Sequence, residues 1–480
     1  MQDLSCISGD IRENEERLNE VFHGCSDVVI KSFTHNEDGL LVVYIDGLTD
    51  HELIEESAIK PFCRGGDIEI ADYSEEEDMN NVIHSVLKGD TALFYKGKFK
   101  ATVVSSKSLP LRSVGENDIE MGIRGPRDSF LESFRKNTSL IRRRIKDPCL
   151  KLKQGTVGRR SRTDYGLMYI EGIVNESLVQ DIEARLEKYE IDGIFDSGMA
   201  EHLMDDGGIF PVFQATTRPD KVASSIMEGR VAIVFDNSPE VLLAPADIGV
   251  MFQGADDYYN SWVVGSFSRI IRYIAAFIAI TLPGLYVALT TFHSEMLPTR
   301  LLFAIVSARS MVTLPIVVEM LVMEILFEFL REAGIRLPGP LGNTIGIVGG
   351  LIVGQAAVDA GIVSTIVIIV VALGAIATFA IPNEGFASVF RLLKFYILLL
   401  SAFLGLFGLM AGLISIGIYF GNLESFGQPY LYPAVGSGGA CEVKDFIIRS
   451  PIDEMKKRPV WADRGNRIRL RRNGGGSNGR

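Results

Sequence analysis

Long apolar segments in the C-terminal part of the chain limit the folds open to it more than any other feature. Residues 273–292 and 395–420 contain no charged side chain, and residues 341–381 contain only Asp359. About 20 residues of α-helix cross the ~30 Å hydrocarbon layer of a bilayer. Residues 1–264, by contrast, are as polar as a soluble protein. The sequence therefore predicts an integral membrane protein with a large soluble module, and a soluble protein with several such core helices is the weak alternative.

The cysteines and the N-terminus indicate a cytosolic setting for the soluble module. The five cysteines are scattered and form no CxxC pair, which argues against a disulfide framework and against a zinc site. Residues 1–14 are polar and acidic, so we expect no signal peptide before the module. The six histidines are dispersed, and neither an HExxH motif nor a P-loop occurs. The sequence therefore predicts no enzyme activity, no cofactor and no metal.

The soluble half contains one pattern twice. Each copy has an apolar strand, an acidic residue followed by glycine, a helical segment, and later a glycine followed by two strands. The first copy comprises residues 41–47, 50–60, 91–95 and 100–105, and the second comprises residues 166–172, 176–188, 231–235 and 240–244. Two related α/β subdomains are the expected result, and chance similarity of common elements is the alternative.

Between the copies, a basic segment predicts an amphipathic helix. Asp128 is suited to cap its start, and Pro148 is suited to end it. One apolar stripe holds Phe130, Phe134, Ile141 and Ile145, and the basic residues off that stripe are Arg135, Lys136, Arg142 and Arg143. Such a helix suits docking on a neighbouring domain, a neighbouring subunit or an anionic membrane surface. A solvated face is the plain alternative. Nucleic acid is a poorer partner, because the chain carries a net charge of −12 and lacks a DNA-binding motif.

The membrane half is expected to contain apolar segments of unequal polarity. They are residues 270–292, 301–330, 341–360, 362–381 and 392–420. The second segment carries Arg309, Glu319, Glu324 and Glu328, with Pro315 in its middle. An ionised group that faces lipid costs at least about 2.5 kcal/mol, so these positions should face protein, water or the interface. Either they line a water-filled path or gate, or they form a carboxylate–arginine network inside the bundle.

A glycine stripe in the third segment indicates close helix packing. Gly342, Gly346, Gly350 and Gly354 recur every four residues, which is the small-residue spacing found between membrane helices. Gly408 and Gly412 repeat this spacing in the last segment. Close packing is the safe interpretation, and self-association of the chain into a ring is the bolder one.

Basic residues beside the apolar segments suggest how the chain is oriented. Arg269 and Arg272 precede the first segment, which places the N-terminal module in the cytosol, and the basic tail belongs there too. An even number of crossings is then required. We therefore favour four crossings over five, with residues 301–330 interfacial or re-entrant. Arg391 and Lys394 would then flank the final span on the outer side, against the rule that basic residues flank spans on the cytosolic side.

These features divide the chain into five parts. They are a first α/β subdomain (1–120), a basic amphipathic linker helix (121–160), a second α/β subdomain (161–264), a transmembrane helical domain (265–423) and a basic cytosolic tail (424–480). The predicted fold class is an α+β soluble N-terminal module followed by an α-helical multi-pass membrane domain.

Several separate blocks of sequence between about residues 40 and 460 also occur in the order that a known family shows. The main block contains Arg124, Gly125, Pro126 and Arg127 and continues through residues 137–148 with Arg142, Arg143 and Arg144; further blocks are residues 218–223, 228–232, 256–262 and 331–338. Together they closely resemble the signature of the A subunit of spore germinant receptors, the GerA family.

The resemblance implies a function that the spacing alone does not show. It implies a nutrient-responsive complex in the inner membrane of a bacterial spore, assembled with B-type and C-type subunits. It also implies that the A subunit forms a ring that passes ions early in germination. Two alternatives stay open, namely a related sporulation membrane protein that amplifies ion release without a nutrient partner, and a membrane transporter that acts alone.

Overall fold

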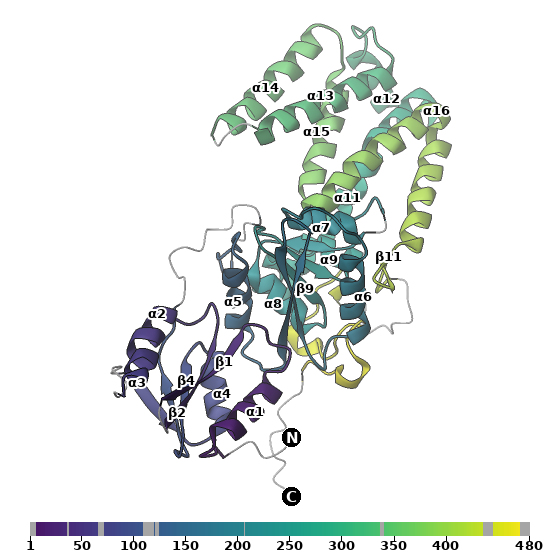
Figure 1. Cartoon of the computed structure of the whole chain (residues 1–480). Coiled ribbons are helices and arrows are strands. Elements are labelled where there is room, and N and C mark those ends of the chain that lie inside the picture. Colours follow the sequence, from purple (N-terminus) through teal and green to yellow (C-terminus); the bar gives the residue numbers. More distant parts are fainter. Residues whose placement is uncertain are drawn as a thin grey trace, which may run out of the picture.

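The computed structural model consists of two sheet-containing units followed by a helical half (Figure 1). It describes residues 6–35, 38–65, 72–108, 120, 124–205, 207–336, 340–434 and 445–470. The first unit lies at one end of the molecule, the second unit lies in the middle, and the helical half extends from the second unit (Figure 1).

The first unit is an antiparallel sheet covered by helices. Its strands lie in the order β1-β2-β4-β5-β3. The strands are β1 (Val28–His35), β2 (Asp38–Ile45), β3 (Tyr73–Glu76), β4 (Thr91–Tyr95) and β5 (Ala101–Val104), and the helices are α1 (Ile11–Val21), α2 (His51–Ile54), η1 (Glu55–Ile59), α3 (Lys60–Cys63) and α4 (Met79–Leu87). Alternate residues of β2 enter two different cores, which explains its continuous apolar run. Leu41 and Val43 belong to one core, and Leu40 and Val42 belong to the other.

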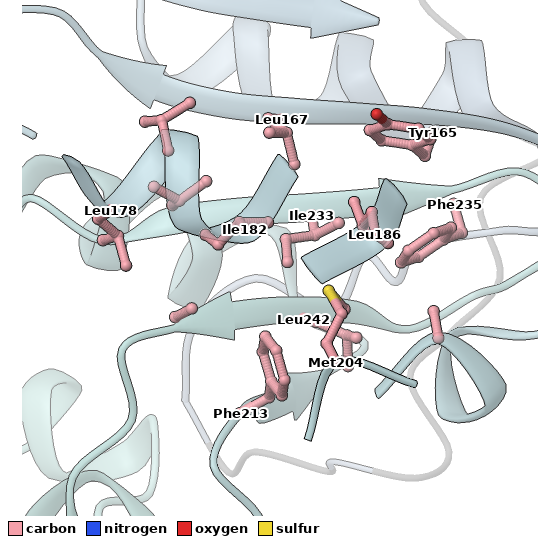
Figure 2. Packing of buried hydrophobic residues seen from close by; sticks show 14 of the residues in the cluster. Tyr165, Leu167, Leu178, Ile182, Leu186, Met204, Phe213, Ile233, Phe235 and Leu242 are labelled. Atoms are coloured by element: carbon pink, nitrogen blue, oxygen red, sulfur yellow. The ribbon is translucent and has the colours of Figure 1, made fainter. Parts of the chain in front are cut away.

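The second unit repeats this topology. Its strand order is β6-β7-β9-β10-β8, which matches the first sheet strand for strand, so the repeat extends from the sequence to the fold. The strands are β6 (Leu150–Val157), β7 (Thr163–Ile170), β8 (Gln214–Thr216), β9 (Val231–Phe235) and β10 (Val241–Ala244), and the helices are α6 (Glu176–Glu187), α7 (Ser197–Met204) and α8 (Pro219–Met227). Figure 2 shows one core of this unit, in which Leu178, Ile182 and Leu186 of α6 pack against Leu167 and Ile233 of the sheet.

The linker helix is shorter than the sequence predicts. It is α5 (Phe134–Arg144), preceded by Ser133 in an extended conformation and followed by Ile145, which is also extended. The expected cap at Asp128 is wrong, because residue 128 lies in a non-helical segment that joins the second unit through a hydrogen bond from the Phe130 amide to the Thr217 carbonyl. The helix packs against α8 and β9.

The helical half contains six main helices among the described residues. They are α11 (Trp262–Thr291), α12 (Thr299–Ala308), α13 (Ile316–Arg336), α14 (Pro340–Asp359), α15 (Thr365–Phe379) and α16 (Glu384–Asn422); short elements beside them are α9 (Ile248–Phe252), α10 (Asp256–Tyr259), η2 (Ser294–Met296), β11 (Glu424–Ser425), β12 (Gln428–Pro429), η4 (Ile452–Glu454) and η5 (Arg464–Asn466). By length and composition, α11 and α16 are suited to cross a membrane, and α12 and α15 are shorter apolar helices.

Two of the predicted segments are divided. Residues 301–330 are not one helix, because α12 ends at Ala308 and α13 begins at Ile316. Pro315 directly precedes α13, where its missing N–H leaves no helical hydrogen bond unmade.

The last apolar segment is a helical hairpin rather than a single span. Gly405 has φ 62° and ψ −140°, a backbone conformation that residues other than glycine rarely adopt. The residues on either side of Gly405 form two antiparallel arms, since the Tyr396 and Ser415 hydroxyls are 3.0 Å apart. A Cβ at Gly412 would lie 2.5 Å from Ile397, so this glycine permits the close approach of the arms. A straight helix of this length would measure about 58 Å, nearly twice the hydrocarbon layer.

Both ends of the helical half meet the second unit. The α11 helix starts directly after α10, and the Tyr273 ring of α11 lies 4.3 Å from that of Phe252. At the other end, the Phe420 ring lies 4.3 Å from that of Phe210, and the Ile209 amide donates to the Tyr419 hydroxyl at 2.9 Å. The chain therefore enters and leaves the helical half at the same end of the bundle.

Candidate functional site

A buried ion pair joins the two units of the soluble module. Arg142 of α5 donates from Nε and Nη2 to the two carboxylate oxygens of Asp27, at 2.9 and 2.8 Å. Its Nη1 donates to the Leu150 carbonyl at 2.8 Å. Both side chains are almost fully buried, at 0% and 2% exposure. Because Asp27 precedes β1 and Arg142 precedes β6, this contact fixes the first unit against the second.

The other arginines of the family block have separate environments. Arg144 is half-buried and binds Asp128 at 2.7 Å, whereas Arg143 is exposed. The loop with Arg124, Gly125, Pro126 and Arg127 is also exposed. This loop touches the base of the helical half, because the Arg124 amide donates to Asp256 at 3.4 Å and a Cβ at Gly125 would collide with the Tyr259 ring.

The second unit is bound to α10 through a small polar network. Arg218 binds Asp220 at 2.9 Å, and the Tyr259 hydroxyl donates to the same carboxylate at 2.6 Å. Arg218 also donates to the Pro126 carbonyl. Burial and the hydrogen bond to Asp220 raise the pKa of Tyr259 to about 12, so this hydroxyl is protonated at neutral pH.

Charged residues also connect α11 to α10 and to the C-terminal segment. Arg269 is fully buried, and its Nη1 donates to Asp445 at 2.9 Å. Arg272 donates to the buried Asp257 at 2.7 Å. The Tyr258 hydroxyl donates to Asp445 at 2.7 Å, and burial raises the pKa of Tyr258. The hydroxyls of Tyr258 and Tyr259 therefore each bind a carboxylate, although both side chains are partly exposed, and Trp262 is exposed as well.

The C-terminal segment is part of the folded module rather than a free tail over its described residues. Arg230 binds Asp247 at 2.6 Å and lies 4.6 Å from the Trp461 ring centroid. Glu228 accepts from Arg469 at 2.8 Å. Arg469 of this segment therefore neutralises an acid of the module, which net charge along the sequence does not reveal.

In the helical half, the predicted polar positions are paired within the chain. Glu319 is buried and accepts from Arg309 at 2.8 Å and from the Ser364 amide at 3.1 Å. This contact joins α13 to the α12–α13 connection and to the start of α15. The sequence left two interpretations open for these residues, a water-filled path and a carboxylate–arginine network. This contact is of the second kind.

A second buried pair joins α13 to α16. Lys394 forms an ion pair with Glu324, and the two side chains are 3% and 0% exposed. Glu328, one turn further along, lies 3.7 Å from Lys394 and 3.8 Å from Arg391, and it also pairs with Arg331. The sequence analysis placed Lys394 beside the final span and did not pair it with Glu324, although a lysine next to the charge-free stretch at 395–420 requires an anionic partner.

The glycine stripe is only partly visible. The side-chain surroundings of Gly342 and Gly346 lie outside the described residues. A Cβ at Gly350 would lie 3.9 Å from Leu330, and one at Gly354 would lie 3.9 Å from Ile368. These are ordinary contact distances, so neither glycine is needed for packing inside the chain. Gly284 differs, because a Cβ there would lie 2.8 Å from the Ser401 hydroxyl.

One carboxyl group in the second unit should make stability depend on pH. Burial, with repulsion from Asp205 and Glu240, raises the pKa of Glu201 to about 7 from an ordinary value of 4.5. The folded chain therefore binds the extra proton between these values, and stability falls as the pH rises from about 4.5 to about 7. We expect Glu201→Gln to raise stability at pH 8 by on the order of 2 kcal/mol and to have little effect at pH 4.

Thermal unfolding of the detergent-solubilised chain across this pH range tests the Glu201 prediction. Glu187→Gln, at an exposed position on α6, is the matched control. An unchanged pH slope in Glu201→Gln would contradict the assignment.

Comparisons with known proteins match nearly the whole chain. The family model described as Bacillus/Clostridium GerA spore germination protein matches residues 16–461. The chain is 38% identical over 477 residues to the uncharacterized membrane protein YfkQ of Bacillus subtilis (strain 168), covering 96% of this chain and 93% of that protein. It is 39% identical over 485 residues to spore germination protein KA of the same organism, covering 96% and 88%. The crystal structure of the N-terminal domain of the A subunit of the Bacillus megaterium spore germinant receptor GerK3 is 30% identical, with a TM-score of 0.39, and covers 51% of this chain and 97% of that domain.

Proposed function

The chain belongs to the Bacillus/Clostridium GerA spore germination family, as the A subunit of a germinant receptor, and from this premise we propose that its helical half forms an oligomeric path for ions. The path opens when the receptor responds to a nutrient. This A subunit is a membrane protein and not an enzyme.

The observation that carries the proposal is the buried ion pair between Glu324 and Lys394. Two charged groups inside an apolar bundle are expensive to bury, even when they are paired. Apolar residues of similar volume would stabilise the bundle at least as well. Charge at this position is therefore better explained by a role in ion movement or gating than by stability alone. Glu328, with three basic neighbours, extends the polar region along α13.

A continuous series of contacts supports transduction from the soluble module to this bundle. Arg142 joins the two units, and the loop at residues 124–127 touches Tyr259 of α10. The same short helix carries Asp257, which binds Arg272 of α11. The α11 helix then packs along α15 and α16. A displacement of the soluble module therefore has a direct mechanical route to the helices that carry the ion pairs.

The proposed topology has the soluble module and the C-terminal segment on the cytosolic side of the spore inner membrane. Support comes from the helical half, whose two ends meet the same face of the second unit, so that the number of crossings is even. Four crossings satisfy this condition and five do not. The B-type and C-type subunits, the lipid bilayer and further copies of this chain are the proposed partners.

The direct experiment is to reconstitute the purified chain with its B-type and C-type subunits in liposomes. Nutrient-dependent cation flux, together with an oligomeric mass of the chain in detergent, is the expected result. A monomeric chain, or the absence of flux from a fully assembled complex, would refute the ion-path proposal while leaving membership of the family unaffected.

The ring requires an interface between copies, and the glycine stripe of α14 is the proposed one. Gly350→Leu should abolish the oligomer in detergent, because a leucine fills the groove that a second helix needs. Gly417→Leu is the matched control, since a Cβ at Gly417 meets nothing within 4 Å. Size-exclusion chromatography with light scattering measures the mass, and an intact oligomer in Gly350→Leu would exclude this interface.

A further inference from the structure

The motif that contains Glu228 and Arg230 borders a cavity that the ion-path proposal does not use. A cavity of about 480 Å³ lies between the second unit, α10 and the C-terminal segment. A smaller one of about 120 Å³ lies beside it toward Gln214. Residues that line both include Glu228, Arg230 and Tyr258, so the two form one site. The larger volume is within the range of small-molecule sites, roughly 300–1,000 Å³.

Three buried side chains in the cavity walls have polar atoms without a hydrogen-bond partner. They are Nε of Arg230, Nε1 of Trp461 and both amide atoms of Gln214. The exposed fractions of these residues are 1%, 7% and 1%. A buried donor without an acceptor costs about 1–3 kcal/mol, so such groups normally have a partner in the functional state. The unpartnered atoms are thus three donors, Nε of Arg230, Nε1 of Trp461 and Nε2 of Gln214, and one acceptor, Oε1 of Gln214, which leaves the site short of acceptors.

The charged residues around the cavity also leave an excess of positive charge. Five cationic residues and four carboxylates line the larger cavity. The carboxylates of Glu228, Asp247 and Asp445 are bound to arginines, and the fourth, Glu454, is exposed. Lys456 and Lys457 also line the cavity and are exposed, and neither has an acidic partner within the part of the chain that the structure describes. The surplus is therefore in cations and N–H donors, and the missing group is an acceptor with negative charge.

We propose that this cavity binds a small dissolved anion that carries a carboxylate or a phosphate group. Lys456 and Lys457 attract the anion at the entrance, and the N–H groups of Arg230 and Trp461 bind it in the interior. The anion would hold the C-terminal segment against the second unit. Because Asp445 in the same wall binds Arg269, the bound anion would also stabilise the contact with α11. The proposal does not depend on ion conduction.

The two tryptophans of the chain make the site directly observable. The sequence contains only Trp262 and Trp461, so Trp262→Phe leaves Trp461 as the one fluorescent indole. The full chain in non-ionic detergent is titrated with inorganic phosphate and, separately, with succinate, at ionic strength matched by sodium chloride. We expect at least one of these anions to give a saturable change in Trp461 emission, whereas chloride gives none.

Two lysine variants in this background decide where the anion binds. Lys456→Gln with Lys457→Gln should weaken binding at least tenfold. Lys31→Gln with Lys88→Gln removes the same charge from exposed positions of the first unit and should leave binding unchanged. The proposal is overturned if neither anion differs from chloride, or if both lysine pairs weaken binding equally. A response that appears only after phosphatidylglycerol is added would also overturn it, because the ligand would then be a lipid headgroup.

Discussion

Replacing Arg142 by methionine is expected to destabilise the soluble module by about 3–5 kcal/mol, because it leaves Asp27 buried and unpaired. Asp27 is only 1% exposed, so water does not replace the lost guanidinium. No other cationic side chain among the described residues donates a hydrogen bond to Asp27. The same change also frees the Leu150 carbonyl. Denaturant unfolding of the detergent-solubilised chain measures the loss.

Two further variants separate the lost ion pair from other effects of the Arg142 substitution. Arg143→Met changes the same residue type at an exposed neighbouring position and should cost well under 1 kcal/mol. Asp27→Leu combined with Arg142→Met removes both charges and should recover most of the stability. If Arg142→Met is as mild as Arg143→Met, the proposed junction between the two units does not exist.

Replacing Lys394 by methionine is expected to have an effect of similar size on the helical half. It leaves Glu324 buried without a counter-charge, at a cost of about 3–5 kcal/mol. The assembled complex should become scarce and should unfold at a lower temperature in detergent. Arg336→Met is the matched control, because Arg336 is exposed near the end of α13 and pairs only with Glu332 among the described residues.

The double variant with Glu324→Leu and Lys394→Met distinguishes a structural pair from a functional one. Removing both charges should restore assembly, since an apolar pair packs at least as well as a buried ion pair. Cation release should nevertheless stay impaired if these charges serve ion movement. Normal cation release from the double variant would show that the pair contributes only to packing.

Local patterns were sufficient to predict much of the fold. The hairpins at β4–β5 and β9–β10 and the helix α6 follow from β-branched runs, turn residues and helical spacing. The duplication of the module was also visible, because the same element types recur in the same order. The strand β6 was missed, although the apolar–polar alternation from Leu150 to Lys153 is the period-two signal of a strand.

Other features depend on contacts between distant parts of the chain. Arg142 was expected off the apolar stripe, and only the fold reveals that Asp27, 115 residues away, makes its burial possible. Glu324 and Lys394 are separated by 70 residues in the same way. The reversal at Gly405 has no polar turn residue to mark it, because lipid surroundings keep turn and helix equally apolar. The carboxylate partners of Tyr258 and Tyr259, beside α11, are likewise distant in the sequence and become visible only in the fold.

The most direct test of the ion-path account is cation release from spores whose only A subunit carries Glu328→Gln, with Glu332→Gln as the control. Glu328 has basic neighbours on α13 and α16, whereas Glu332 is exposed one turn away and pairs only with Arg336 among the described residues. The account predicts that nutrient-triggered release changes several-fold in Glu328→Gln while the receptor assembles in normal amount, and that Glu332→Gln behaves as the parent. Identical release from all three strains would contradict it.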